Sequence, residues 1–540
     1  MAMNIEDTVR RADRVKAERG TWESHWQELA DYCLPTKATV THAKTPGTKL
    51  GTTLYDSTAQ QSVLVYAAGL HSYLTNPSAR WFELALNNRA LMMAAEVRSW
   101  LKEVEEEIFF ILNNSNFNHQ IHEGYIDFAV FGHANIYEEQ DEEDIVRFYT
   151  RPVSEICLAE NIKGRVDTIF RFFSLSARQA RQMWDDPGQK ARELINANKP
   201  DDEVSYLQAI MPREERLAGK LDSVNKPYAS YYIEPKTKKL LSEGGYDEFP
   251  FFCPRCYKTS NSPYAYSPSA VALPDIKTLN SMSKTILKAG QKMLNPPIVL
   301  PDDGFLMPFK LTEGGVNVRL PGAGVSEGKV ETIDVKPNIP VGLDLENQRR
   351  ESIRRAYFVD LFLMLADQPR MTATEVRERV NEKMLILGPT LGRLMSELLN
   401  PIIIRTFNIL LREGRLPPMP EILAGQRYKI EYISPLAKAQ RMTEAQSIDT
   451  FLAEVRAIAE MSPDVIDNVN LDRAAQKLND IYNVPGDILR SDSEIRQIRQ
   501  QRAQAQQQQR EFAEIVEGTG AAQKAAQAVK DLRDDTRPRA

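Results

Sequence analysis

The spacing of apolar and polar residues predicts a helical hairpin in the middle of the chain. Between Pro274 and Leu294, apolar residues recur at spacings of three, four and seven, which predicts a helix with one apolar face. A second such stretch runs from Leu343 to Leu365, and arginines occupy its first turns. The segment between them, 295–342, is rich in Pro and Gly and predicts a small β module. The pattern therefore predicts two rods that carry a head.

The first 273 residues predict an α+β fold, within a chain that is mainly helical. We expect helices over residues 6–35, 57–76 and 95–113, and alternating strands over 132–173. Gly20 is expected to divide the first of these segments into a pair of helices.

The longest periodic run in the chain follows the hairpin, over residues 372–414. Thr372 and Glu375 have the spacing of a capping box, which would begin this helix. Proline lacks the backbone N–H that a helix interior requires. We therefore expect a kink beside Pro389 and a kink or break at Pro401.

The last hundred residues differ in pattern from the rest. Two or three short amphipathic helices are expected over 441–490, with breaks at Pro463 and at Pro485-Gly486. From Ser493 the sequence favours helix but has almost no apolar stripe. Such a segment is either disordered or held by neighbouring copies of itself, and composition leaves both interpretations open.

Charge limits how the chain can bind nucleic acid. The 540 residues include 68 basic and 74 acidic side chains, a net charge of −6, so any DNA contact must be local. We find no apolar run of 18 residues and no N-terminal signal segment in the sequence. These features predict a protein that neither spans a membrane nor is secreted by the usual route, and that is cytosolic at birth.

The motifs that would indicate an enzyme or a metal site are incomplete. Cys253 and Cys256 form a single C-x-x-C with no second pair, so all four cysteines are expected to be reduced structural thiols. His119 and His122 have helical spacing and are better interpreted as helix positions beside a core. The segment Pro321–Val330 lacks the first Gly and the Ser or Thr of a phosphate loop. No catalytic residue, cofactor or metal ligand is predicted.

Four stretches of the sequence stand out as a set. They are YDSTAQQSVLVYAAGLHSYLTNPSARWF, DFAVFGHANIY, LPDIKTLN with the following KMLNPPIVL, and MTATEVRERVNEKMLILGPTLGRLMSELLNPII. Together they resemble the portal, or head-to-tail connector, proteins of short-tailed, T7-like bacteriophages. The stretches are spread from Tyr55 to Ile403, so the resemblance covers most of the chain. The last hundred residues match no motif of that family.

The resemblance implies a structural protein and not an enzyme. It implies a dodecameric ring at one capsid vertex, which forms the channel for packaging and ejection of double-stranded DNA. The implied partners are further copies of the chain, double-stranded DNA, the packaging terminase, a tail adaptor, capsid and scaffolding proteins, and internal core proteins, with no membrane. The implied location is the virion, at its head-tail vertex, after assembly in the host cell cytoplasm.

The resemblance also implies a division of the chain into parts. In chain order they are an N-terminal wing over 1–273, stem helix 1 over 274–294, a small β-rich clip over 295–342, stem helix 2 over 343–365, a tunnel loop over 366–371, a kinked helix with the rest of the wing over 372–440, and crown or barrel helices over 441–540. The clip is expected to meet the packaging motor and the adaptor. The tunnel loop is expected to narrow the channel.

Candidate functional residues follow from this division. The tunnel loop contributes Asp367, Gln368, Pro369, Arg370 and Met371, and Gln368 and Arg370 are our first choices for DNA contact. The stem contributes Lys284, Lys288, Lys292, Arg349, Arg350 and Arg354. The lysines are equally well explained as the solvated face of a helix, and the arginines as partners of acidic groups on an adjacent subunit. The clip surface contributes Pro301, Phe305, Phe309, Lys310, Arg319 and Lys329.

Two other classes of protein are alternatives. Another ring-forming head-tail adaptor would also need a subunit that packs against its own copies, but the smaller typical length of adaptors argues against it. A nucleic-acid packaging enzyme is disfavoured because the phosphate loop and a metal cluster are missing from the sequence.

Overall fold

The computed structural model divides the chain into two compact units. The described residues are 5–42, 47–88, 91, 94–217, 219–220, 222–294, 298–299, 331–332, 339–363, 387–423, 430–433, 435–460, 462–482, 494–495, 497–505, 507 and 527. The first unit comprises residues 1–87, 103–418 and 429–435, and the second comprises 88–102, 419–428 and 436–540. Helices and small antiparallel sheets both occur, so the fold is mixed, as the sequence predicts.

The N-terminal helix α1 (Ile5–Cys33) is continuous, and the break predicted at Gly20 is wrong. A glycine inside a helix costs only about 1 kcal/mol relative to alanine, and the packing of its neighbours outweighs that cost. Arg19 is buried and donates to three backbone carbonyl oxygens of residues 153–156. Trp26, two turns further on, is completely buried.

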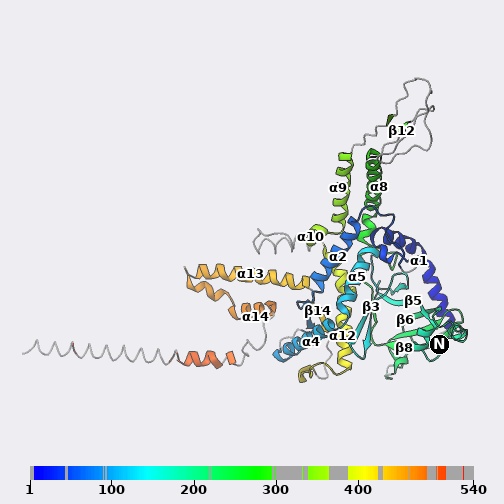
Figure 1. Ribbon diagram of the computed structural model, residues 1–540. Coiled ribbons are helices and arrows are strands. Elements are labelled where there is room, and N and C mark those ends of the chain that lie inside the picture. Colours follow the sequence, from blue (N-terminus) through cyan, green and yellow to red (C-terminus); the bar gives the residue numbers. More distant parts are fainter. Residues whose placement is uncertain are drawn as a thin grey trace, which may run out of the picture. The chain divides into compact units, whose positions relative to one another are not determined.

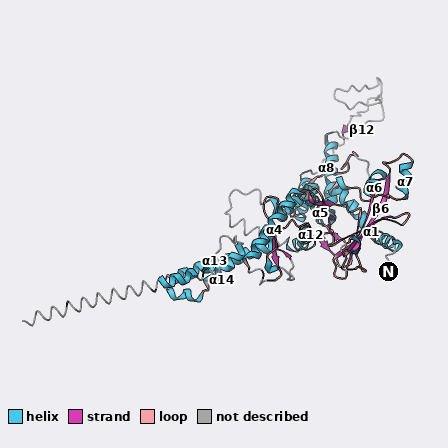
Figure 2. Ribbon diagram, turned by 90° about the horizontal axis from the view of Figure 1, so that it is seen from below, coloured by secondary structure: helices cyan, strands magenta, loops and turns pink. Residues whose placement is uncertain are grey.

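A five-stranded antiparallel sheet in the order β4-β5-β6-β7-β8 lies beside α1. Its strands are β4 (Ile156–Glu160), β5 (Val166–Ser176), β6 (Glu203–Pro212), β7 (Tyr228–Glu234) and β8 (Lys239–Tyr246). Successive side chains of a strand point to opposite faces, and both faces are covered. The first turns of α1 pack on the face that carries Phe170 and Leu207. The short helices α6 (Ala177–Met183) and α7 (Gln189–Asn196) pack on the face of Phe173 and Tyr206 (Figure 2).

A second sheet joins strands from distant parts of the chain. Its order is β3-β2-β9, with β2 (Ile136–Asp141), β3 (Ile145–Thr150) and β9 (Phe251–Phe252). The predicted strands over 132–173 are therefore confirmed as β2 to β5. Helix α5 (Phe117–Phe131) leads into this sheet through Gly132, whose φ is +82°. A Cβ at this position would lie 2.2 Å from the carbonyl oxygen of Ala265, so the turn requires glycine.

Two further predicted helices are confirmed, and the remaining strands form short pairs. The helices are α2 (Thr58–Leu74) and α4 (Ala95–Asn114), and α4 includes residues of both units. The pairs are β1 (Glu83–Leu86) with β14 (Ile430–Ile433), β10 (Tyr257–Lys258) with β11 (Ala265–Tyr266), and β12 (Ile298–Val299) with β13 (Glu331–Thr332). Short 3₁₀ turns occur at Pro35–Lys37, Ser223–Asn225 and Glu421–Leu423.

The first helix of the predicted hairpin is longer than its pattern indicates. Helix α8 (Pro268–Leu294) begins at Pro268 and passes through Pro274 without ending. The hydroxyl of Ser267 accepts the Ala270 N–H at 2.9 Å, which caps the new start. Pro268 suits the first turn of α8, because the N–H that proline lacks would have no helical partner there.

The second helix of the hairpin, predicted as one segment over 343–365, is two helices. Helix α9 (Ile339–Ala356) ends at a turn, and α10 (Val359–Leu363) follows. Phe358 in that turn has a φ of +54°, a left-handed conformation that cannot continue a helix. The buried Tyr357 beside it donates to the Ser269 hydroxyl at 2.7 Å, which ties the turn to the start of α8.

The long helical segment Leu387–Arg412 continues past Pro401, where the sequence predicts a kink or a break. A π-helical turn, η3 (Met395–Leu399), precedes α12 (Asn400–Arg412), and the wider turn brings Pro401 into the first turn of α12.

By length and composition, the segment Leu387–Arg412 could cross a membrane, yet 61% of its most apolar window is buried inside the structure. We therefore interpret it as a core helix. The predicted capping box at Thr372 lies outside the described residues.

The second unit is helical over most of its described residues. It contains nearly all of α13 (Pro435–Ala459), the short turn η5 (Pro463–Asn468) and α14 (Leu471–Tyr482). The predicted break at Pro463 is confirmed, whereas Pro485-Gly486 lies outside the described residues. Residues 497–505 are helical, and Arg499 pairs with Asp472 of α14 at 2.6 Å.

Two glycines inside helices allow a matched stability test. A Cβ at Gly69 of α2 would lie 2.3 Å from the Phe362 ring, whereas a Cβ at Gly20 would meet nothing within 4 Å. Gly69→Ala should lower the free energy of unfolding by about 1–3 kcal/mol, because the ring must move. Gly20→Ala should raise it by up to about 1 kcal/mol. Urea unfolding followed by circular dichroism measures both, and shifts of the same sign would contradict this packing.

Candidate functional site

Helices α8 and α9 lie side by side and antiparallel, and they form the hairpin that the sequence singles out (Figure 1). The contact between them is partly polar. The Ser283 hydroxyl donates to a Glu346 carboxylate oxygen at 2.7 Å, and both residues are buried. Gly342 allows the two helices to approach closely, since a Cβ there would be 3.0 Å from the Ile286 side chain. The pairing of these residues sets the register of the hairpin.

The three stem lysines lie on the face of α8 that points away from α9. Lys284, Lys288 and Lys292 are all exposed. Lys288 is five residues from Ser283, which places it on roughly the opposite side of the helix from the contact with Glu346. The ammonium of Lys284 lies 5.5 Å from the centre of the Tyr55 ring. The lysine stripe is therefore accessible to solvent or to a polyanion.

Two of the stem arginines have partners within the same chain. Arg349 donates to Asp275 of α8 at 2.8 Å, and Arg350 contacts both Asp56 and Glu346 at 3.0 Å. The sequence left open DNA or an adjacent subunit as their partner. The structure adds a third possibility, because these arginines hold α9 against α8 and against the segment before α2. Arg354 is exposed.

The remaining predicted site residues lie outside the described residues. These are the tunnel-loop residues 367–371 and the clip residues between 301 and 329. At the base of the insert, β12 pairs antiparallel with β13, with Ile298 opposite Thr332. The two ends of the predicted clip are thus joined by backbone hydrogen bonds.

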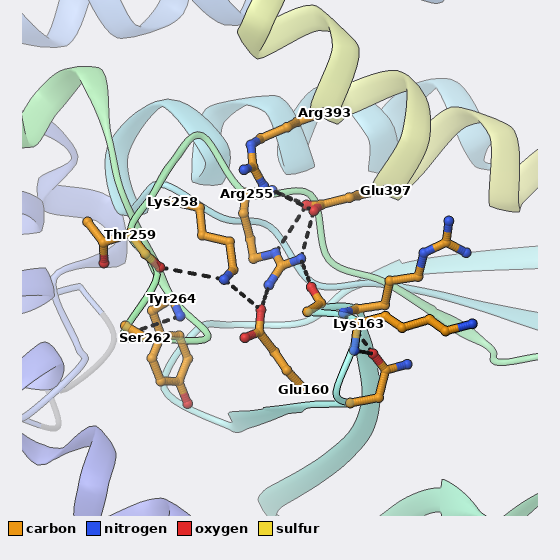
Figure 3. A network of polar contacts seen from close by, with 12 residues as sticks. Glu160, Lys163, Arg255, Lys258, Thr259, Ser262, Tyr264, Arg393 and Glu397 are labelled. Atoms are coloured by element: carbon orange, nitrogen blue, oxygen red, sulfur yellow. Dashed lines mark hydrogen bonds and ion pairs between the residues drawn. The ribbon is translucent and has the colours of Figure 1, made fainter.

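A buried arginine at the C-x-x-C segment is a feature that the sequence analysis missed (Figure 3). Arg255 is 2% exposed, and its guanidinium binds Glu397 of the π-helical turn at 2.7 and 3.1 Å. The same guanidinium pairs with Glu160 of β4 and donates to the Gly164 carbonyl oxygen at 2.9 Å. One side chain therefore joins a strand, a loop and the long helix. No local pattern signals this, since 142 residues separate Arg255 from Glu397.

Burial changes the acidity of the cysteines and of a partly buried histidine. All four cysteines are buried free thiols, and burial raises the pKa of Cys256 to about 12 and that of Cys33 to about 11. Thiols with such pKa values are poor nucleophiles at neutral pH. Burial also lowers the pKa of His122, whose ring lies 5.8 Å from that of His71. Among the described residues, no three potential metal ligands come together.

Comparison with known proteins identifies the class of protein. The family described as bacteriophage head to tail connecting protein matches residues 6–489. The chain is 31% identical over 486 residues to the probable portal protein of Bordetella phage BPP-1, covering 88% of this chain and 87% of that relative. It is also 31% identical over 499 residues to the portal protein of Salmonella phage epsilon15, covering 91% of this chain and 90% of that relative.

A solved structure adds little to the sequence comparisons. A chain in the virion of a native gene transfer agent particle aligns with a TM-score of 0.32 and 10% identity, covering 74% of this chain and 86% of that chain. A score this low supports no argument about fold.

The family match and the two relatives decide the assignment. The chain belongs to the family of bacteriophage head to tail connecting proteins. Its function is that of a portal protein, the structural connector between phage head and tail.

The Arg255 network provides a matched pair of variants. Glu397→Gln should destabilise the chain by about 3 kcal/mol, because it leaves a buried guanidinium without its main countercharge. Arg393→Gln removes the other partner of Glu397, which is 40% exposed, and should cost less than about 1 kcal/mol. Urea unfolding midpoints of the two variants and the parent measure the difference. Equal costs would show that Arg255 does not anchor the helix.

Proposed function

We propose that twelve copies of this chain assemble into a ring at one capsid vertex, at the head-tail junction of the virion. The ring forms the channel through which double-stranded DNA enters and leaves the head. The observation that supports this best is the family match over residues 6–489, which includes the whole α8–α9 hairpin. The role is structural, and the chain supplies a passage and not a catalyst.

We propose that each part of the chain has its own role in the ring. Residues 1–273 and 372–440 form the wing, and residues 274–294 and 343–365, which include most of α8 to α10, form the stem. The insert 295–342 is the clip, where the packaging terminase and then the tail adaptor dock. Residues 366–371 form the tunnel loop, and 441–540 form the crown inside the head, near capsid, scaffolding and internal core proteins. The ring assembles in the host cytoplasm.

The charges of the chain suit a channel that guides DNA without holding it. Each phosphate neutralised by a cation adds to binding, and a ring multiplies every such contact. The net charge of −6 limits this attraction. The within-chain ion pairs of Arg349 and Arg350 limit it further on the stem. We propose that Arg370 and Gln368 make the main DNA contacts and that Lys284, Lys288 and Lys292 are secondary.

Electron microscopy of the purified full-length chain tests the assembly. We expect rings with twelve-fold symmetry and a central hole in negative stain, and a mass in solution of about twelve subunits. A monomer at every concentration up to the micromolar range, or a closed two-fold dimer, would contradict the proposal.

A charge reversal tests the tunnel loop. Arg370→Glu should reduce DNA packaging by roughly tenfold or more while rings still form, because each phosphate that passes would meet a ring of carboxylates. The control is Arg216→Glu, the same change at an exposed position in the loop after β6. Nuclease-protected DNA per particle measures packaging. Equal packaging by both variants would remove Arg370 from the channel.

A further inference from the structure

The α8–α9 hairpin has two unlike sides, and the first side carries projecting apolar residues. The segment before α2 marks this side, because the Tyr55 N–H binds Asn280 of α8 at 2.7 Å and Asp56 binds Arg350 of α9 at 3.0 Å. Leu287 follows Asn280 by two helical turns, and Leu343 precedes Arg350 by two turns, so both leucines project from the same side.

We define the ridge as Tyr55, Leu287 and Leu343. Their exposed fractions are 41%, 55% and 45%. Large apolar side chains exposed together on one side of an element indicate a surface that another molecule covers.

The second side of the hairpin is hollow. We define the groove by Thr278, Met282, Thr285 and Ile286 of α8 and Gly342 of α9, which line one concave surface. Met282 is two residues from Asn280, and in a helix such a spacing places side chains on opposite sides. Leu345 is two residues from Leu343, is 44% exposed, and so borders the groove on α9. The groove and the ridge therefore face in opposite directions.

The ridge and the groove also lie at the same height along the hairpin. Leu343 and Leu345 differ by about 3 Å along the axis of α9, and Thr285 and Leu287 differ by the same amount on α8. A rotation about an axis that runs along the hairpin would bring the ridge of one copy to the groove of the next. A head-to-tail contact requires two different surfaces on opposite sides of one subunit. Such contacts form a ring when the rotation between subunits closes.

We infer that the ridge of each copy packs into the groove of the neighbouring copy, and that this contact holds adjacent stems together. The inference rests on the proposed ring. A partner of another kind would cover one side and leave the other exposed, whereas a second copy on each side covers both. The lysine stripe runs along α8 between the two surfaces: Lys284 lies beside Tyr55 of the ridge, and Lys288 is one turn from Thr285 of the groove.

Three variants of the full-length chain test this contact. The ridge variant carries Leu287→Glu and Leu343→Glu, which place carboxylates where apolar side chains should be buried. The groove variant is Thr285→Trp, which fills the groove from an exposed position. The control is Asp344→Lys, a charge change at an exposed position of α9 that is two residues from Glu346 and so points away from α8 and from both surfaces. Circular dichroism of each variant confirms that it is folded.

For the ridge variant and for the groove variant, we expect the number of assembled rings at a given concentration to fall at least about tenfold. We expect the control to form as many rings as the parent. An equal mixture of the two should give dimers and no rings, because each variant retains one intact side. Mass photometry counts these species. Rings at parental yield from either variant, or full rings from the mixture, would overturn the inference. A parent chain that forms no rings would instead contradict the proposed function.

Discussion

Three buried arginines anchor the helices of the first unit to its strands and connecting segments. Arg19 of α1 binds the carbonyl oxygens of residues 153–156, Arg255 binds Glu397 and Glu160, and Arg405 of α12 binds the carbonyl oxygen of residue 248 at 3.0 Å. A guanidinium that leaves water is stable only where its donors find partners. Each arginine therefore allows one arrangement of the segments that it joins, and the rest of this unit depends on that arrangement.

A firm base explains how the hairpin can project. The first half of α8 is packed into the unit, where Ala272, Ile276 and Leu279 are buried, whereas Leu287 in its second half is exposed. The buried Tyr357 at the end of α9 bonds to Ser269 at the start of α8. The two helices thus leave the unit from one fixed point, and what they expose beyond it is suited to contacts with other molecules. A connector protein needs such a combination of fixed base and available surface.

The ion pairs of the hairpin limit the positive charge that it presents. Arg349 and Arg350 are neutralised by acidic groups of their own chain, which removes cationic charge from the stem without leaving a charge unpaired. These pairs are partly exposed, so each contributes little to stability. The pairs matter more because they determine which cations of the hairpin can bind a polyanion. Lys284, Lys288 and Lys292 remain exposed. A channel wall with few free cations lets a duplex slide, because fewer condensed counterions are displaced.

The sequence by itself determined the features that depend on local spacing. The helices over 57–76 and 95–113, the strands over 132–173 and the two-rod hairpin all follow from apolar periodicity, and the quoted motifs were enough to recognise the family. The exposed stripe of Lys284, Lys288 and Lys292 also follows from this spacing, whereas its contact with DNA stays a prediction. Periodicity carries this information because it reports which face of an element meets the core.

Only the tertiary structure decided the features that depend on distant partners. Gly20 predicts a helix break locally, yet contacts made by Arg19 across more than a hundred residues keep α1 continuous. The C-x-x-C spacing indicates that Cys253 and Cys256 are structural thiols, but it gives no sign of the buried Arg255 between them, whose partner Glu397 lies 142 residues away. The same holds for Arg350 and Asp56. The physical reason is that burial and pairing of a charge are set by chain segments that meet only in the folded state, so no local spacing encodes them.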